Sequence, residues 1–70
     1  MFTASVITVS DKGFRGERED TAGPLAAQML REAGYEVIAQ SIVPDEQPLI
    51  EAELKRHADT LGASLILTSG

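Results

Sequence analysis

The stretch that decides the fold is residues 6–24, VITVSDKGFRGEREDTAGP. Its first four residues are all β-branched and mostly apolar, which is typical of a strand buried on both faces. A helical pattern begins at Pro24. The connection between them, from Ser10 to Gly23, contains three glycines, three basic residues and four acidic residues. Strand–helix connections are usually about 2–6 residues long, and longer ones tend to be functional or disordered. Because ligands of open α/β sheets bind beyond the carboxyl ends of strands, we expect this loop to border a site.

Three apolar runs alternate with two helical patterns along the chain. The runs predict strands at roughly 4–10, 36–43 and 64–68, and the crossovers are long enough for parallel pairing. The fold class is therefore α/β, with helices covering a mostly parallel sheet in a β-α-β-α-β order. The nearly continuous apolar character of the runs at 4–10 and 64–68 indicates central strands, whereas the mixed polarity of residues 36–43 indicates a peripheral one. We therefore expect the spatial order 2-1-3.

The third run has the composition of a strand buried on both faces, and such a strand needs neighbours on both sides. We therefore expect residues 1–70 to be the N-terminal portion of one larger domain. The alternative is a stand-alone small domain that depends on self-association, because a chain of this length buries only about 60% of its unfolded surface.

The helical patterns carry their own boundary signals. The first helix is predicted from Ala22 or Pro24 to Ala33, with Asp20 or Thr21 as its cap and Gly34 after its end. Its apolar face is expected to pack on the sheet and contains Leu25, Met29, Leu30 and Ala33. The second helix is predicted between an Asp45 cap and Gly62. Its charged residues, Glu51, Glu53, Lys55 and Arg56, are expected to face solvent, and the lone His57 to be partly exposed and structural.

Composition excludes several classes of protein. The 70 residues carry a formal charge of −5, which disfavours binding to nucleic acid. The sequence has no cysteine, no apolar stretch near the roughly 20 residues that span a bilayer, and no visible signal peptide. We expect a soluble cytoplasmic protein that does not bind membranes.

Three segments should meet where the parallel strands end: the Ser10–Pro24 loop, the Val43-Pro44-Asp45 turn and Thr68-Ser69-Gly70. The helix start at residues 21–24 favours an anion, although Gly23-Pro24 could equally serve only to shape the turn. The three basic loop residues could contact phosphate, and Asp11 and Asp20 fit such a site if Mg²⁺ is bound with the phosphate. These features together suggest a phosphate-bearing ligand.

One of these segments has an ordinary explanation as well, and another has only a weak motif. Asp45 follows a proline and precedes a helix, so it could be a simple helix cap or a carboxylate that positions a metal or an attacking group. Thr68-Ser69-Gly70 resembles the beginning of a glycine-containing phosphate loop. It matches neither the P-loop nor the dinucleotide-binding pattern.

The segments together resemble the molybdenum cofactor biosynthesis family of the Mog/MoaB type. The resemblance rests on Val9-Ser10-Asp11, Glu19-Asp20-Thr21-Ala22-Gly23-Pro24, Ile42-Val43-Pro44-Asp45-Glu46 and Leu65-Ile66-Leu67-Thr68-Ser69-Gly70. It implies a three-layer α/β domain of about twice this length, usually trimeric. The implied reaction is the adenylylation of molybdopterin with MgATP, which gives molybdopterin-AMP and pyrophosphate, and a downstream metal-insertion enzyme is a possible partner.

The resemblance also assigns residues. It implies that Asp45 is catalytic and a metal ligand, and that substrates contact Ser10, Asp11, Asp20, Thr21, Gly23, Thr68, Ser69 and Gly70. The family's second key aspartate lies beyond its glycine loop, so we expect the full-length protein to be an enzyme and the 70-residue chain alone to be inactive.

Two alternatives remain. One is a molybdopterin-binding module without catalysis, which the presence of Asp45 disfavours. The other is a generic doubly wound nucleotide-binding domain, which the long first loop and the missing dinucleotide fingerprint disfavour.

Overall fold

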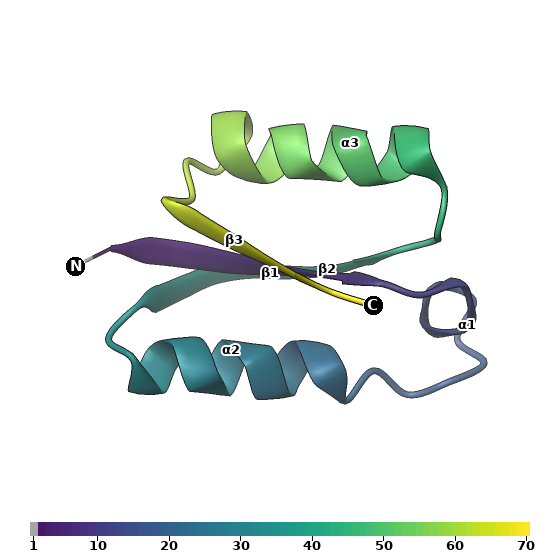
Figure 1. Ribbon diagram of the computed structural model, residues 1–70, viewed down its shortest axis with the longest axis horizontal. Coiled ribbons are helices and arrows are strands. Elements are labelled where there is room, and N and C mark those ends of the chain that lie inside the picture. The colour runs from purple at the N-terminus through teal and green to yellow at the C-terminus, as the bar shows by residue number, and fades with distance from the viewer. Residues whose placement is uncertain (1) are drawn as a thin grey trace.

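The computed structural model describes residues 2–70, which form three layers (Figure 1). The elements are β1 (Thr3–Val9), α1 (Asp11–Phe14), α2 (Ala22–Glu32), β2 (Glu36–Val43), α3 (Gln47–Lys55), the π-helix η1 (Arg56–Thr60) and β3 (Leu65–Ser69). Helix α2 covers one face of the sheet and α3 covers the other. The predicted α/β class and three-layer architecture are confirmed. Within residues 2–70, the helices are all too short or too polar to cross a membrane.

The sheet has the order β2-β1-β3, and both pairings are parallel, as predicted. The central strand β1 is buried from Ala4 to Thr8, because strands flank it on both edges and helices cover both faces. Thr8 pairs with Ile42 on one side and with Ser69 on the other. The carboxyl ends of the three strands therefore lie together.

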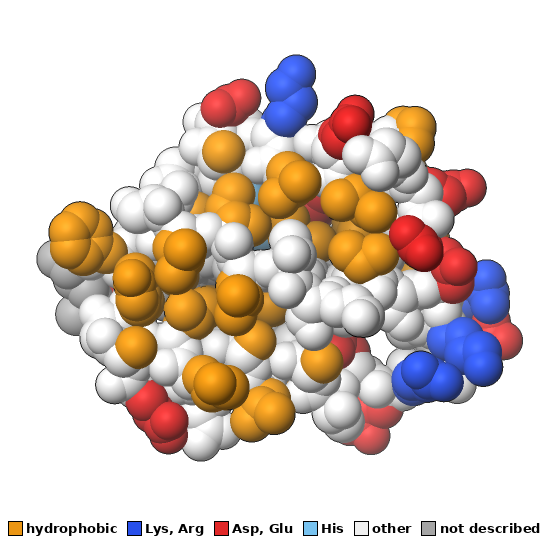
Figure 2. Space-filling model, viewed as in Figure 1, with side chains coloured by type: hydrophobic (Ala, Val, Ile, Leu, Met, Phe, Trp, Pro, Cys, Tyr) orange, Lys and Arg blue, Asp and Glu red, His pale blue; other side chains and the backbone are white. Residues whose placement is uncertain are grey.

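The third strand departs from the prediction that it is buried. β3 pairs with β1 alone among the described strands, and Leu65 and Leu67 are 37% and 39% exposed. On α2, Ala27 and Leu30 are buried, whereas Leu25 and Met29 are 58% and 61% exposed. Ala33 follows the end of α2 and is exposed as well, so the prediction that these three residues pack on the sheet was wrong. The apolar face of α2 is wider than the sheet beneath it. Figure 2 shows hydrophobic side chains gathered over β3 and the adjoining helices.

The other helical layer is held by a buried polar cluster. The π-helix η1 places His57 against the sheet, where the side chain is fully buried, so the expectation of a partly exposed histidine was wrong. His57 Nδ1 lies 2.7 Å from Ser5 Oγ on β1, and His57 Nε2 lies 3.0 Å from Ser41 Oγ on β2. The imidazole therefore connects η1, at the C-terminal end of α3, to strands β1 and β2. We call Ser5, Ser41, Glu53, Arg56 and His57 the histidine cluster.

Glu53 also differs from the sequence prediction of a solvent-facing residue. Its side chain is 14% exposed and accepts hydrogen bonds from Arg56 Nε at 2.6 Å and Nη2 at 2.9 Å. Its carboxylate lies 3.5 Å from His57 Nε2. The Arg56 hydrogen bond lowers the pKa of Glu53 from 4.5 to about 2, against burial, which raises it. The acid is therefore ionised beside the imidazole at neutral pH.

Candidate functional site

The segment after β1 is partly helical, where the sequence predicted an open polar loop. Ser10 caps α1 with its side chain, since Ser10 Oγ accepts a hydrogen bond from the Gly13 amide at 3.0 Å. The Ser10 amide donates to the Val43 carbonyl at 2.9 Å. The single turn of α1 is thereby fixed against the end of β2.

Asp20 shapes the start of α2. Asp20 Oδ2 accepts from the Thr8 hydroxyl at 3.2 Å, and Oδ1 accepts from the Gly23 amide at 3.0 Å. Thr21 occupies the cap position without a side-chain cap bond, so Asp20 supplies the capping carboxylate. A Cβ on Gly23 would lie 2.5 Å from Asp20 Oδ2 and 2.9 Å from Thr8 Oγ1, so any larger residue would displace one of these side chains.

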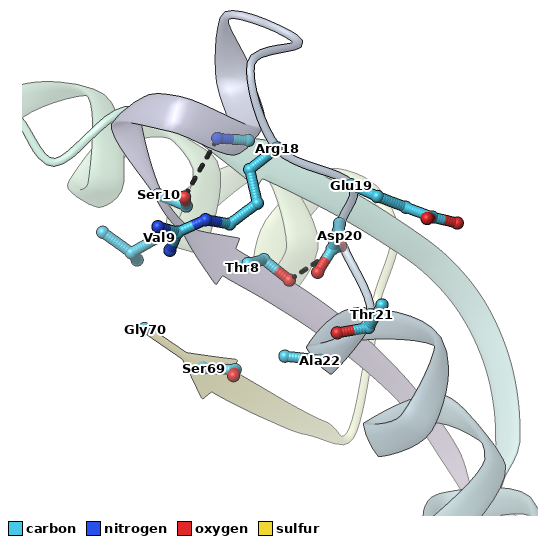
Figure 3. Close-up of a pocket in the computed structure, with 11 residues that line it drawn as sticks. Thr8, Val9, Ser10, Arg18, Glu19, Asp20, Thr21, Ala22, Ser69 and Gly70 are labelled. Carbon is cyan, nitrogen blue, oxygen red and sulfur yellow. Dashed lines mark hydrogen bonds between the residues drawn. The ribbon is translucent and has the colours of Figure 1, made fainter.

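A hollow of about 230 Å³ opens at the carboxyl ends of β1 and β3 (Figure 3). Its lining comes from the ends of those two strands and the segment that leads into α2. The lining residues are Thr8, Val9, Ser10, Gly13, Arg18, Glu19, Asp20, Thr21, Ala22, Ser69 and Gly70. We call this hollow the carboxyl-edge pocket.

Five of the residues assigned from sequence meet in the carboxyl-edge pocket: Ser10, Asp20, Thr21, Ser69 and Gly70. Sequence reasoning did not single out Thr8, because it lies in the buried run of β1. It named Arg18 only as one of three loop cations, with Lys12 and Arg15, that could contact phosphate. In Figure 3 the Arg18 side chain extends across the pocket toward Ser10 and Val9, whereas Glu19 points away. The pocket thus combines a guanidinium with several hydroxyl groups.

Two assigned residues lie elsewhere. Gly23 lines a second hollow of about 530 Å³, which shares Thr8, Gly13 and Asp20 with the first. Thr68 is exposed, pairs with Ile7 at the edge of the sheet, and lines neither hollow.

Asp11 and Asp45 are not in the lining of the carboxyl-edge pocket, although Asp11 directly follows the lining residue Ser10. The Asp45 amide donates to Asp11 Oδ1 at 2.8 Å, which connects α1 to the turn after β2. The prediction that Asp45 caps the second helix was wrong: α3 begins at Gln47, and Glu46 occupies the cap position. The two aspartates are exposed and next to each other.

Residues 2–70 contain no group of three or more histidine, cysteine or acidic side chains placed to hold a metal ion by themselves. A single exposed carboxylate fits a different mode of binding. Mg²⁺ keeps several waters and is usually held by one or two carboxylates together with substrate phosphates. Asp45 matches that donor set only if a phosphate-bearing substrate is bound alongside.

The carboxyl-edge pocket places hydroxyls and a guanidinium beyond the strand ends of an open α/β sheet, which is where proteins of this fold class bind their ligands. Comparison of the sequence with protein families refines that class. Residues 5–70 match the family described as the probable molybdopterin binding domain, and the chain belongs to this family.

Individual relatives agree with this assignment. The chain is 44% identical over 69 residues to the molybdopterin adenylyltransferase of Pyrococcus furiosus, which covers 99% of this chain and 40% of that protein. It is 34% identical over 67 residues to the molybdopterin adenylyltransferase of Haemophilus influenzae, which covers 93% of this chain and 34% of that protein.

Solved structures share the fold. The molybdopterin biosynthesis enzyme MoaB from Thermus thermophilus has a TM-score of 0.87 and 51% identity, covering all of this chain and 44% of the other. The tungsten cofactor synthesizing protein MoaB from Pyrococcus furiosus has a TM-score of 0.84 and 42% identity, covering all of this chain and 42% of the other. The chain thus spans less than half the length of each of these four proteins.

Proposed function

We propose that residues 1–70 are the N-terminal portion of a single molybdopterin-binding domain, and that the full-length protein adenylylates molybdopterin. The observation that carries this proposal is the carboxyl-edge pocket, whose hydroxyls and guanidinium suit a phosphate-bearing ligand. Two relatives named molybdopterin adenylyltransferase support it. The exposed apolar side chains of α2 and β3 are consistent with further structure covering them.

In the proposed reaction, an oxygen of the terminal phosphate of molybdopterin attacks the α-phosphorus of ATP. The bond from that phosphorus to the bridging oxygen breaks, and pyrophosphate leaves with the bonding electrons. Such a transfer depends on positioning the two phosphates and on stabilising their charge. Enzymes achieve both with backbone amides, hydroxyls and cations.

The pocket offers groups of this kind. The hydroxyls of Ser10, Thr21 and Ser69 and the guanidinium of Arg18 line it, and Gly70 closes its β3 side. Guanidinium groups bind phosphate oxygens in pairs. We assign these residues to substrate phosphates and Thr68 to the same edge of the site.

Asp20 and Gly23 contribute to the proposed site by fixing the form of its wall. Both oxygens of Asp20 accept internal hydrogen bonds, which fixes the wall between the two hollows. Gly23 leaves room for that carboxylate at the start of α2. We assign both residues to the part of the wall that substrates contact.

Asp45 is the proposed catalytic residue and metal ligand, because its carboxylate is exposed and Glu46, rather than Asp45, occupies the cap position of α3. Asp45 would hold Mg²⁺ together with the phosphates. The ion would neutralise negative charge on the phosphate oxygens.

The wider proposal follows the family resemblance. It places the protein in the cytoplasm as a homotrimer, with molybdopterin and ATP as substrates. The product would pass to a downstream metal-insertion enzyme.

The test is to incubate the full-length protein with molybdopterin, ATP and Mg²⁺ and to assay molybdopterin-AMP and pyrophosphate. We expect both products, and we expect Asp45→Ala to lower their formation by at least about 100-fold. Asp59→Ala, at an exposed position of η1, is the control and should be as active as the wild type. Full activity of Asp45→Ala would remove that residue from catalysis.

A binding module without catalysis is the second candidate. It is favoured by one observation: Asp45 lies outside the lining of the carboxyl-edge pocket, so a ligand could occupy the pocket without touching it. Molybdopterin binding with no AMP transfer in the wild type would select this candidate.

A further inference from the structure

The turn after β2 that bears Asp45 is held from a distant part of the chain. The Asp45 amide donates a hydrogen bond of 2.8 Å to Asp11 Oδ1, across 34 positions of sequence. The bond fixes the backbone from which the Asp45 side chain departs.

Asp11 is itself held in place by its neighbours. It opens α1, whose cap is Ser10, and Ser10 is tied to the Val43 carbonyl on β2. The Arg15 amide donates to the Asp11 carbonyl at 3.1 Å, which completes the turn. The carboxylate of Asp11 therefore stands on a small element that is fixed to the same strand end from which the Asp45 turn begins.

Asp45 is not held by the helix α3 that follows it. Glu46, and not Asp45, occupies the cap position of α3, and that position has no side-chain cap bond. Among the hydrogen bonds within residues 2–70, the Asp45 amide has Asp11 as its partner and the Asp45 carboxylate has none. The backbone of this residue is fixed while its acid group stays free.

We propose that Asp11 is a positioning residue that acts through Asp45, and that it does not contact substrate. This inference rests on the proposed function for the role of Asp45. Asp11 orients the Asp45 turn so that the Asp45 carboxylate reaches the reacting phosphates or their Mg²⁺. What Asp11 must supply in this role is an oxygen acceptor at Oδ1, and its negative charge is secondary.

Two variants of Asp11 separate the effect of its oxygen acceptor from the effect of its charge. Asp11→Asn keeps an oxygen acceptor and removes the charge, whereas Asp11→Ala removes both. Lys12→Ala, at the next exposed position of α1, is the matched control. Circular dichroism of each variant establishes that the fold is kept, which we expect because Asp11 is exposed.

The first measurement does not depend on activity. Hydrogen exchange of the Asp45 amide, followed by NMR, should become about fivefold faster in Asp11→Ala, as loss of one net hydrogen bond predicts. It should change little in Asp11→Asn and in Lys12→Ala. Unchanged exchange in Asp11→Ala would overturn the proposal.

The second measurement is steady-state AMP transfer by the full-length protein. We expect kcat to fall about tenfold in Asp11→Ala with KM for ATP nearly unchanged, and Asp11→Asn to recover most of kcat. An equal loss in both variants with a raised KM would mean that the charge of Asp11 contacts a ligand, which overturns the proposal. If the wild type transfers no AMP, the proposed function fails, while amide exchange still decides whether Asp11 holds the Asp45 turn.

Discussion

The histidine cluster and the carboxyl-edge pocket are built from similar side chains but differ in what their polar atoms contact. In the cluster, Ser5, Ser41 and Glu53 close on His57 and Arg56 beneath α3, and no buried side-chain polar atom of residues 2–70 lacks a partner. In the pocket, hydroxyls and a guanidinium face an opening. The difference teaches that polar groups satisfied by one another stabilise the fold, whereas polar groups facing an opening are available to a ligand.

The largest expected effect comes from removing the centre of the histidine cluster. His57→Ala would leave a void and would deprive the hydroxyls of Ser5 and Ser41 of their imidazole partner. We expect the free energy of unfolding to fall by about 3 kcal/mol, measured by urea denaturation. Below its melting temperature the variant should still bind ligand with unchanged affinity.

The control for this variant is Asp59→Ala on the exposed side of η1, which should stay within about 0.5 kcal/mol of the wild type. If His57→Ala changed stability no more than this control, the cluster would not support the fold. If folded His57→Ala bound ligand more weakly than the wild type, the histidine cluster would also contribute to ligand binding, and the proposed division of roles between it and the carboxyl-edge pocket would be wrong.

A smaller effect on the free energy of unfolding is expected at Gly23, which lies in close contact with Asp20 and Thr8. Gly23→Ala would place a Cβ 2.5 Å from Asp20 Oδ2, although alanine ordinarily favours a helix. We expect the steric conflict to dominate and to lower the free energy of unfolding by about 2 kcal/mol, measured by urea denaturation.

A double-mutant cycle identifies the cause. Asp20 supplies two of the three atoms nearest to that Cβ, so the cost of Gly23→Ala should shrink in an Asp20→Ala background. An unchanged cost would show that Asp20 is not the source of the conflict.

The smallest effect concerns the pH dependence of the cluster. Because the pKa of Glu53 is lowered to about 2 from 4.5, its ionised form stabilises the fold above pH 4.5, and this contribution is lost as the pH falls toward 2. We expect the loss to be about 1 kcal/mol, since Arg56 is half-exposed and solvent screens the pair. Urea denaturation from pH 6 to pH 2 measures it.

Two variants sharpen this result. Glu53→Gln should remove the loss of stability between pH 4.5 and pH 2. Arg56→Gln should move that loss to higher pH, because it removes the hydrogen bond that lowers the pKa of Glu53. An identical acid profile in all three proteins would show that Glu53 has no part in it.

Local sequence patterns predicted much of the fold. The β-branched run ending at Val9 and the glycines at 34 and 62, which have φ of 95° and 70°, marked element boundaries that the structure bears out. The mixed polarity of residues 36–43 indicated an edge strand, and β2 lies at an edge. These signals worked because each depends on a residue and its near neighbours.

Predictions that depended on distant contacts were less successful. A histidine among charged residues gave no sign that η1 would turn it toward Ser5, which lies 52 positions earlier. Helical spacing correctly placed Met29 on an apolar face but could not show how far the sheet beneath it extends. The bond from the Asp45 amide to Asp11 was equally invisible, since it joins a turn to a helix 34 positions away.

The central place of β1 has a consequence for the order in which the molecule can assemble. Strand β1 is synthesised before the residues with which it pairs, 36–43 and 65–69, so its edges stay open until those segments have emerged. Contacts between such distant residues require the closure of long loops, which slows folding. Until β3 arrives, the apolar run at residues 6–9 presents an unpaired edge of the kind that promotes aggregation.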